Sequence, residues 1–130
     1  MGIIYKPKRM VSTVPGKERT GYFAMKVNSG MISMNTLCKS ISEKCSLTSA
    51  DVKGVVEALV HEIEVNLTHG RSIQVGDLGI FSASVTSPVV DTPEELTSKK
   101  VRIKNVTFLP SVRIKETMKE AQFIRQKELD

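Results

Sequence analysis

The sequence predicts an α+β fold: a β-hairpin, two helices, a second hairpin with a long projecting arm, and a last helix. Two patterns support this order. Apolar residues recur at three- and four-residue spacing over residues 34–67, which is typical of amphipathic helices. On both sides of residues 88–98, apolar and polar residues alternate, as they do in half-buried strands. With 130 residues, the chain is long enough for one domain with a modest core.

The composition indicates a soluble globular protein that weakly favours an anionic partner. The 19 Lys and Arg residues outnumber the 14 Asp and Glu residues, which gives a formal net charge of +5. The excess lies mainly in residues 1–30, which carry six Lys or Arg residues and one Glu. No signal peptide or membrane-spanning run is visible, so we expect a cytoplasmic protein without a membrane partner.

The first 30 residues are predicted to form a hairpin. Residues 3–11 are expected to be an edge strand, because Pro7 has no amide hydrogen for a central ladder. A turn at residues 15–18 leads to a return strand over residues 21–27. The basic residues of this hairpin fit either a nucleic-acid face or the solvated charges of an exposed edge. They are Lys6, Lys8, Arg9, Lys17, Arg19 and Lys26.

Two helices follow the hairpin. Ser33 is the predicted N-cap of a helix over residues 34–45. Thr48 is predicted to cap a second helix of about 20 residues, with Asp51 in the capping-box position. Gly70 is expected to stop that helix, because glycine adopts a left-handed conformation at little cost.

A compact strand and turn come next and lead into the arm. A short strand around Ile73 and Val75 is followed by the turn Gly76-Asp77-Leu78-Gly79. The outgoing strand starts at Ile80, and residues 88–98 are expected to form a loop at the arm tip.

The return strand is predicted over residues 99–108, and its alternation changes along its length. Val101 and Ile103 share one parity, whereas Val106 and Phe108 share the parity of Lys100, Arg102 and Lys104. The buried face should therefore switch along the strand. Pro110 and Ser111 are the start signal of a last helix, which is predicted over residues 112–123. A frayed tail is expected over residues 125–130.

No residue pattern indicates catalysis, a metal site or a cofactor. Cys38 and Cys45 lie about two turns, roughly 10 Å, apart on one predicted helix, too far for a disulfide within it. His61 and His69 have no further ligands at suitable spacing. No nucleophile with a base and no glycine-rich phosphate loop is visible, so we expect neither an enzyme nor a small-molecule substrate.

The ordered motifs resemble the HU/IHF family of bacterial histone-like DNA-binding proteins. The resemblance covers about residues 33–123. It depends on residues 47–53, Gly70, the strand at residues 73–75, Leu78-Gly79-Ile80-Phe81, and Val106-Thr107-Phe108. The additional N-terminal hairpin is similar to a Bacteroides-type subgroup. We therefore expect an extension over residues 1–32 packed on an IHF-like domain over residues 33–124, followed by the tail over residues 125–130.

The resemblance implies an intertwined homodimer and a set of site residues. Its dimer core corresponds to Leu78, Phe81 and Phe108 here. Its basic arm and the phosphate-binding side of its last helix correspond to Lys99, Lys100, Arg102, Lys104, Arg113, Lys115 and Lys119. The partner would be double-stranded DNA in the nucleoid.

The sequence departs from the family at the arm. The family carries an Arg-x-Asn-Pro tip whose proline wedges between base pairs, but this chain has Asp91-Thr92-Pro93-Glu94-Glu95. Pro93 is therefore either a wedge or a plain loop proline. Ser84 and Thr86 replace arginines that the family usually carries.

These observations leave two functional hypotheses. The first is an HU-like architectural protein that binds and condenses duplex DNA with little sequence specificity. The second is an HU-like fold used as a protein-interaction or structural module with weak or no DNA binding, which the acidic tip favours.

Overall fold

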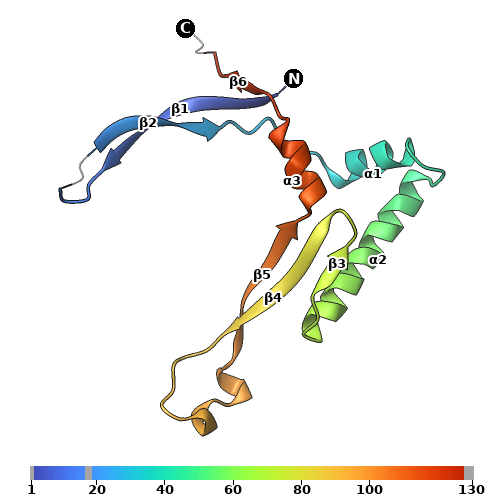
Figure 1. Cartoon of the computed structure of the whole chain (residues 1–130). Coiled ribbons are helices and arrows are strands. Elements are labelled where there is room, and N and C mark those ends of the chain that lie inside the picture. The colour runs from blue at the N-terminus through green and yellow to red at the C-terminus, as the bar shows by residue number, and fades with distance from the viewer. Residues whose placement is uncertain (1, 17–18, 128–130) are drawn as a thin grey trace. The chain divides into compact units, whose positions relative to one another are not determined.

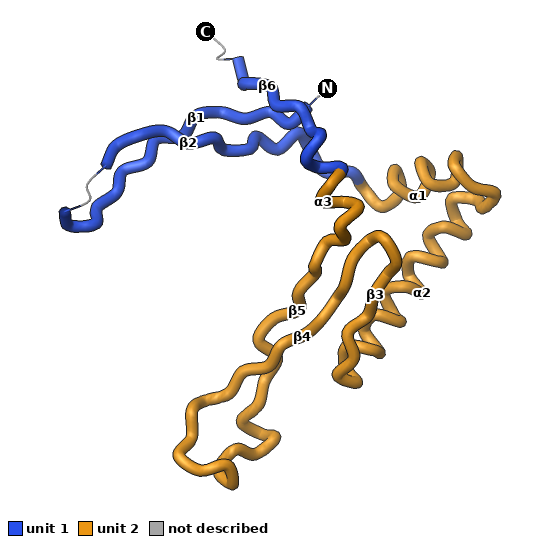
Figure 2. The backbone as a smooth tube through the Cα atoms, in the orientation of Figure 1, with its two compact units in different colours: residues 1–32, 117–130 blue, residues 33–116 orange. Residues whose placement is uncertain are grey.

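The computed structural model describes residues 2–16 and 19–127 (Figure 1). Two compact units are present, residues 1–32 with 117–130 and residues 33–116 (Figure 2). The α+β prediction is confirmed. The elements are β1 Ile3–Ser12, β2 Arg19–Lys26, α1 Met34–Ser42, α2 Ser49–Thr68, β3 Ile73–Val75, β4 Gly79–Thr86, the 3₁₀ turns η1 Pro93–Glu95 and η2 Ser98–Lys100, β5 Arg102–Pro110, α3 Val112–Lys119 and β6 Phe123–Arg125.

The first unit contains a three-stranded sheet in the order β2-β1-β6. The predicted hairpin is present as the antiparallel pair β1 and β2, although residues 17 and 18 of its turn lie outside the described residues. The edge-strand prediction is wrong, because β6 pairs in parallel with the start of β1, with Ile3 opposite Phe123. β6 reaches only as far as Tyr5, so Pro7 lies beyond it, where its missing amide hydrogen breaks no β1–β6 ladder.

The last helix is shorter than predicted. α3 ends at Lys119 rather than at residue 123, and the following residues form β6 instead. Arg125, expected to begin a frayed tail, belongs to β6, and the next amide, of Gln126, donates to the carbonyl oxygen of Tyr5 at 2.8 Å. Residues 128–130 of that tail lie outside the described residues.

The predicted helix caps of the second unit are confirmed. The Ser33 side chain accepts a hydrogen bond from the amide of Thr36, and α1 ends at Ser42, three residues before the predicted end. The Thr48 hydroxyl accepts from the Asp51 amide at 3.1 Å, and the Asp51 carboxylate accepts from the Thr48 amide at 3.2 Å. This reciprocal pair satisfies two amides that the first turn of α2 leaves free.

The end of α2 is set by Gly70, as predicted. Its φ is +78°, a left-handed conformation that favours glycine. Its amide donates to the Leu67 carbonyl at 3.0 Å, and the Arg71 amide donates to the Asn66 carbonyl at 3.0 Å. These two bonds form a Schellman motif, which satisfies the last carbonyls of the helix.

The sheet of the second unit has the order β3-β4-β5, with antiparallel neighbours. The predicted turn between β3 and β4 is present, and Gly76 and Gly79 adopt φ values of +44° and +149°. Gly79 is also closely covered, because a Cβ there would meet the carbonyl oxygen of Leu109 and the ring of Phe108. Glycine at position 79 is therefore required by both conformation and space.

The return strand differs from the prediction at its start. β5 begins at Arg102, whereas Lys99 and Lys100 belong to η2. The β4–β5 register shifts between Ser84 and Val85: Ser84 lies opposite Asn105 and Val85 opposite Ile103, which leaves Lys104 without a partner. This β-bulge is the physical cause of the parity change in the sequence.

Few side chains are fully buried. Among the described residues, the hydrophobic ones in this class are Cys38 and Val52, at 1% and 4% exposure, on α1 and α2. In the described part of the chain, no helix combines the length and the apolar character needed to cross a membrane.

Candidate nucleic-acid interface

The β4–β5 hairpin has one continuous apolar face. Because directly paired residues project from the same face and residues alternate along a strand, the register places Phe81, Ala83 and Val85 with their partners Phe108, Val106 and Ile103. Without the bulge at Lys104, Ile103 would project from the opposite face to Val106. The bulge therefore keeps this apolar face continuous into the arm.

This apolar face is only partly covered. The rings of Phe81 and Phe108 contact each other with centroids 4.8 Å apart. Farther out, Val85, Ile103 and Val106 are 64%, 62% and 62% exposed. A hollow of about 230 Å³ lies between the end of α2 and the sheet, and its lining includes Leu67, Ile103 and Val106.

The opposite face of the hairpin is polar beyond its root, where Ile80 lies opposite Leu109. Ser82 and Thr107 lie opposite each other, with their hydroxyl oxygens 3.0 Å apart. Farther along, Ser84 pairs with Asn105 and Thr86 with Arg102. This face presents hydroxyl, amide and guanidinium groups, all of which can bind phosphate oxygens.

The predicted basic residues of the arm fall into two groups. Arg102 lies at the start of β5 and Lys104 at the bulge, and both are exposed. Lys99 and Lys100 lie at the arm tip in η2, close in sequence to the exposed acidic residues of the tip, Asp91, Glu94 and Glu95. The tip thus carries three carboxylates and two ammonium groups, so its basic charge is offset locally. The part of the arm at Arg102 and Lys104, here named the stem, carries basic side chains and no acidic ones.

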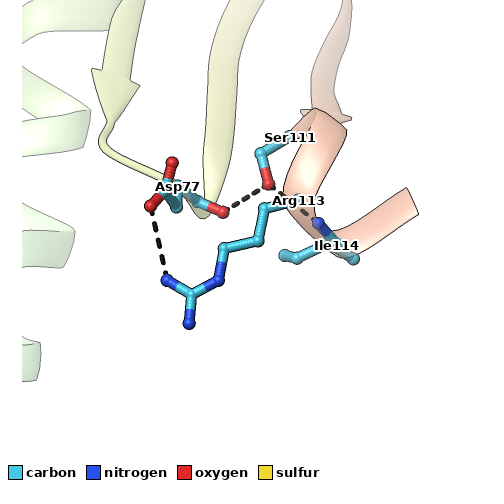
Figure 3. A network of polar contacts seen from close by, with 4 residues as sticks. All are labelled: Asp77, Ser111, Arg113 and Ile114. Atoms are coloured by element: carbon cyan, nitrogen blue, oxygen red, sulfur yellow. Dashed lines mark hydrogen bonds and ion pairs between the residues drawn. The ribbon is translucent and has the colours of Figure 1, made fainter. Parts of the chain in front are cut away.

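A polar network joins the turn at the root of the arm to the start of α3 (Figure 3). The Ser111 hydroxyl donates to the carbonyl oxygen of Asp77 and accepts from the amide of Ile114 at 3.2 Å, so Ser111 also caps α3. The Ser111 amide donates to the Leu78 carbonyl at 3.1 Å. Ser111 therefore links the first turn of α3 to the turn at Asp77 and Leu78.

Arg113 takes part in the same network. Its Nη1 atom lies 3.3 Å from Oδ2 of Asp77 in an exposed ion pair. Arg113 and Lys115 both line a groove of about 370 Å³ along the turn and the start of α3. Lys115 is exposed, whereas Arg113 has its charge partly compensated. Lys119, the remaining predicted DNA-binding residue, lies in the last turn of α3 and belongs to the other unit.

Asn105 was not predicted from the sequence as a site residue. It lies beside the bulge, opposite Ser84, on the polar face. The parity change around Lys104 is the signal that could have located it, because a residue next to a bulge is re-aimed relative to a regular strand.

The described residues contain no group of three or more His, Cys, Asp or Glu side chains arranged to hold a metal ion. Cys38 is buried and Cys45 is exposed, and both are free thiols.

Residues 1–125 match the family described as "HU domain fused to wHTH, Ig, or Glycine-rich motif". The chain belongs to this HU-HIG family. The resemblance to HU proteins found in the sequence is thereby confirmed. No protein with a curated description matches the chain.

Two solved structures are similar to this HU-HIG chain. One is a protein from Bacteroides vulgatus ATCC 8482, described provisionally as a bacterial DNA-binding protein. It has a TM-score of 0.64 and 11% identity, and the match covers 94% of this chain and 47% of that one. This likeness supports the fold, and the chain spans about half the length of the Bacteroides protein. The other is an Anabaena HU–DNA cocrystal structure, with a TM-score of 0.47 and 16% identity. The match covers 68% of this chain and 99% of that one.

Proposed function

We propose that this HU-HIG chain is an architectural, nucleoid-associated protein that binds duplex DNA as a homodimer with little sequence specificity and without catalysis. The observation that carries the proposal is the two-faced β4–β5 hairpin, which beyond its root is apolar on one side and polar on the other, with a basic stem. A DNA-binding role also agrees with the HU domain that the family's description names and with the description of the Bacteroides protein.

The apolar face supports the dimer. The second unit leaves Val85, Ile103 and Val106 more than half exposed, and the hydrophobic side chains fully buried among the described residues are Cys38 and Val52. Burying an exposed valine or isoleucine contributes about 1.5–3 kcal/mol. A second copy that covers this face would supply the core that one copy lacks, with Phe81 and Phe108 at its centre and Leu78 beside it.

The stem of the arm supports phosphate binding. Arg102 and Lys104 are exposed, and Ser84, Thr86 and Asn105 add neutral donors on the same hairpin. Lysine and arginine side chains that bind phosphate release counterions and carry no direct sequence information. Binding through this set should therefore depend strongly on salt and weakly on sequence.

The tip contributes less to binding than the stem in this proposal. Pro93 occupies the first position of η1, followed directly by Glu94 and Glu95. Carboxylates beside a proline oppose its insertion into a polyanion, which favours a plain loop proline over a wedge. Lys99, Lys100, Arg113, Lys115 and Lys119 are secondary candidates for phosphate binding.

A second function, a protein-interaction module, is favoured by one observation. The exposed carboxylates of Asp91, Glu94 and Glu95 lie at the arm tip, where a DNA-binding arm benefits from cations. The absorbance of freshly purified protein at 260 nm discriminates between the two functions. Co-purified nucleic acid favours the first, whereas nucleic-acid-free protein with a bound partner favours the second.

A duplex titration at several salt concentrations tests the proposed function. If about five phosphates are neutralised, the log–log salt slope should be roughly −4 to −5. The double substitution R102A/K104A should weaken binding about tenfold or more for all duplex sequences. It should also make the slope shallower by roughly 0.9 for each phosphate that is no longer neutralised.

The matched control is K39A/K53A, which removes two exposed lysines from α1 and α2 and so changes the net charge equally. It should change duplex affinity little. Equal weakening by both double substitutions would mean that net charge, rather than the arm stem, governs binding. Salt-insensitive or absent duplex binding by the wild type would contradict the proposed function.

A further inference from the structure

The sheet of the first unit carries a second set of residues suited to nucleic acid, on a face that the arm does not involve. Its register is regular from Tyr5 to Ser12, so the residues that share each face follow from the pairing. One face, here named the tyrosine face, carries three aromatic residues and three cations. They are Tyr5, Tyr22, Phe123, Arg9, Lys26 and Arg125.

The three aromatic residues form an oblique row across the sheet. Phe123 lies on β6, Tyr5 on β1 and Tyr22 on β2. Phe123 is level with Ile3, two residues from Tyr5, and Tyr22 is level with Arg9, four residues from Tyr5. The steps along the strands are therefore about 7 Å and 13 Å. Tyr22 and Phe123 are 74% and 67% exposed, so their ring surfaces are accessible to a planar ligand.

The cations are interleaved with this row. Tyr5 lies between Lys26 on one side and Arg125 on the other, and Arg9 lies opposite Tyr22. Within the described part of the chain, no ion pair holds any of these three cations. The three strands, all of whose residues are described, contain no Asp or Glu. This surface is thus complementary to a polyanion.

The row also borders a hollow of about 520 Å³. The lining residues are Ile3, Tyr5, Ala24, Lys26 and Phe123, all of the first unit. The volume lies within the range of small-ligand pockets, about 300–1,000 Å³. A lining of two aliphatic side chains, two aromatic rings and one ammonium group suits a flat, uncharged ring attached to a phosphate.

The opposite face of the same sheet is different. It carries the cations Lys6, Lys8 and Arg19, but Phe23 is its one aromatic residue. Both faces therefore offer charge, and stacking surfaces are concentrated on the tyrosine face. A duplex keeps its bases stacked on one another, whereas a single strand can place each base on an aromatic ring.

We propose that the tyrosine face is a single-stranded nucleic-acid site, in which bases stack on Tyr22, Tyr5 and Phe123 while Arg9, Lys26 and Arg125 bind the backbone. The site is separate from the duplex-binding arm and does not depend on it. Such platforms tolerate any sequence, because every base has a π-face.

The chain provides an internal probe of this site. It contains two tyrosines and no tryptophan, and both tyrosines lie on the tyrosine face. Adding unlabelled oligothymidylate of about 12 nucleotides, within the site sizes of such platforms, should quench the tyrosine emission of the full chain. A duplex of the same length, held by the arm, should leave the emission unchanged.

Two matched pairs of variants locate the site. Y22A should weaken oligothymidylate binding about fivefold or more, whereas F23A, the next residue on the opposite face, should change it little. R9Q should weaken binding and reduce its salt slope by about 0.7, whereas K8Q should have a smaller effect. Y22L retains apolar bulk without the aromatic ring and keeps the test decisive if Y22A does not fold.

The proposed duplex site on the arm and the proposed single-strand site on the tyrosine face can be tested independently. R102A/K104A should leave oligothymidylate binding unchanged, and Y22A should leave duplex binding unchanged. Absence of quenching by oligothymidylate, equal weakening by Y22A and F23A, or equal quenching by the duplex would each overturn the assignment. The last result would show a duplex site instead.

Discussion

The two three-stranded sheets of this chain distribute apolar side chains in opposite ways. In the β4–β5 hairpin, beyond the Ile80–Leu109 pair at its root, apolar residues gather on one face and polar residues on the other, and the bulge at Lys104 keeps the division intact into the arm. In β2-β1-β6, cations occur on both faces and are mixed with exposed aromatic residues such as Tyr22 and Phe123. Segregation suits a sheet that buries one whole face, whereas mixing suits a sheet whose surface is used in the open.

The most disruptive change to this pattern is a charge on the segregated apolar face. V106K places an ammonium group in the proposed dimer interface. An unpaired buried charge costs about 3–5 kcal/mol, so the dimer dissociation constant should rise about 100-fold or more. Sedimentation equilibrium measures the change.

The control for V106K is N105K, in the neighbouring residue on the polar face. It should leave the dimer intact and strengthen duplex binding slightly. A stable dimer of the V106K protein would show that the apolar face is not the interface.

Glycines in the two sheets provide the next comparison. G79A forces a Cβ against the Leu109 carbonyl and the Phe108 ring in a left-handed conformation, which should lower the free energy of unfolding by about 2–3 kcal/mol. G21A meets nothing within 4 Å and needs no unusual φ, so it should be neutral or stabilise by up to about 1 kcal/mol. Urea denaturation of both variants checks the difference, and equal effects would contradict the described packing at the turn.

The smallest expected effect comes from removing the carboxylate partner of an arginine. Arg113 has a carboxylate partner in Asp77, whereas Arg9 and Arg125 have none among the described residues. D77N should release Arg113 and tighten duplex binding by about fivefold at most, because exposed ion pairs contribute about 0–1 kcal/mol. E57Q makes the same change of charge on the exposed side of α2 and should have less effect at moderate salt. Equal tightening by both would assign the effect to net charge.

Predictions about the site were correct where the deciding residues are close together in the sequence, and wrong where distant pairing decides the structure. The glycine turn and the start of α3 at Ser111 were predicted, because their signals lie within a few residues of each other. The positions of Lys99 and Lys100 were predicted wrongly. Lys100 continues the parity of Arg102 and Lys104, but both lysines form a 3₁₀ turn, since the β4–β5 pairing stops at Thr86 and Arg102.

The caps and glycine turns of this protein follow from the sequence alone. The capping box at Thr48 and Asp51, the helix stop at Gly70 and the turn ending at Gly79 depend on hydrogen bonds and backbone conformations that a few adjacent residues specify. The change of parity after Lys104 was also visible, although its cause was not.

Pairings between distant segments, in contrast, became known only from the folded chain. The fold located the bulge opposite Ser84, brought the Leu109 carbonyl against Gly79, and paired β6 with the start of β1. A three-residue strand has too few residues to show a period, and its partner lies more than 100 residues away in the chain. That parallel pairing placed Arg125 beside Tyr5 and thereby completed the tyrosine face.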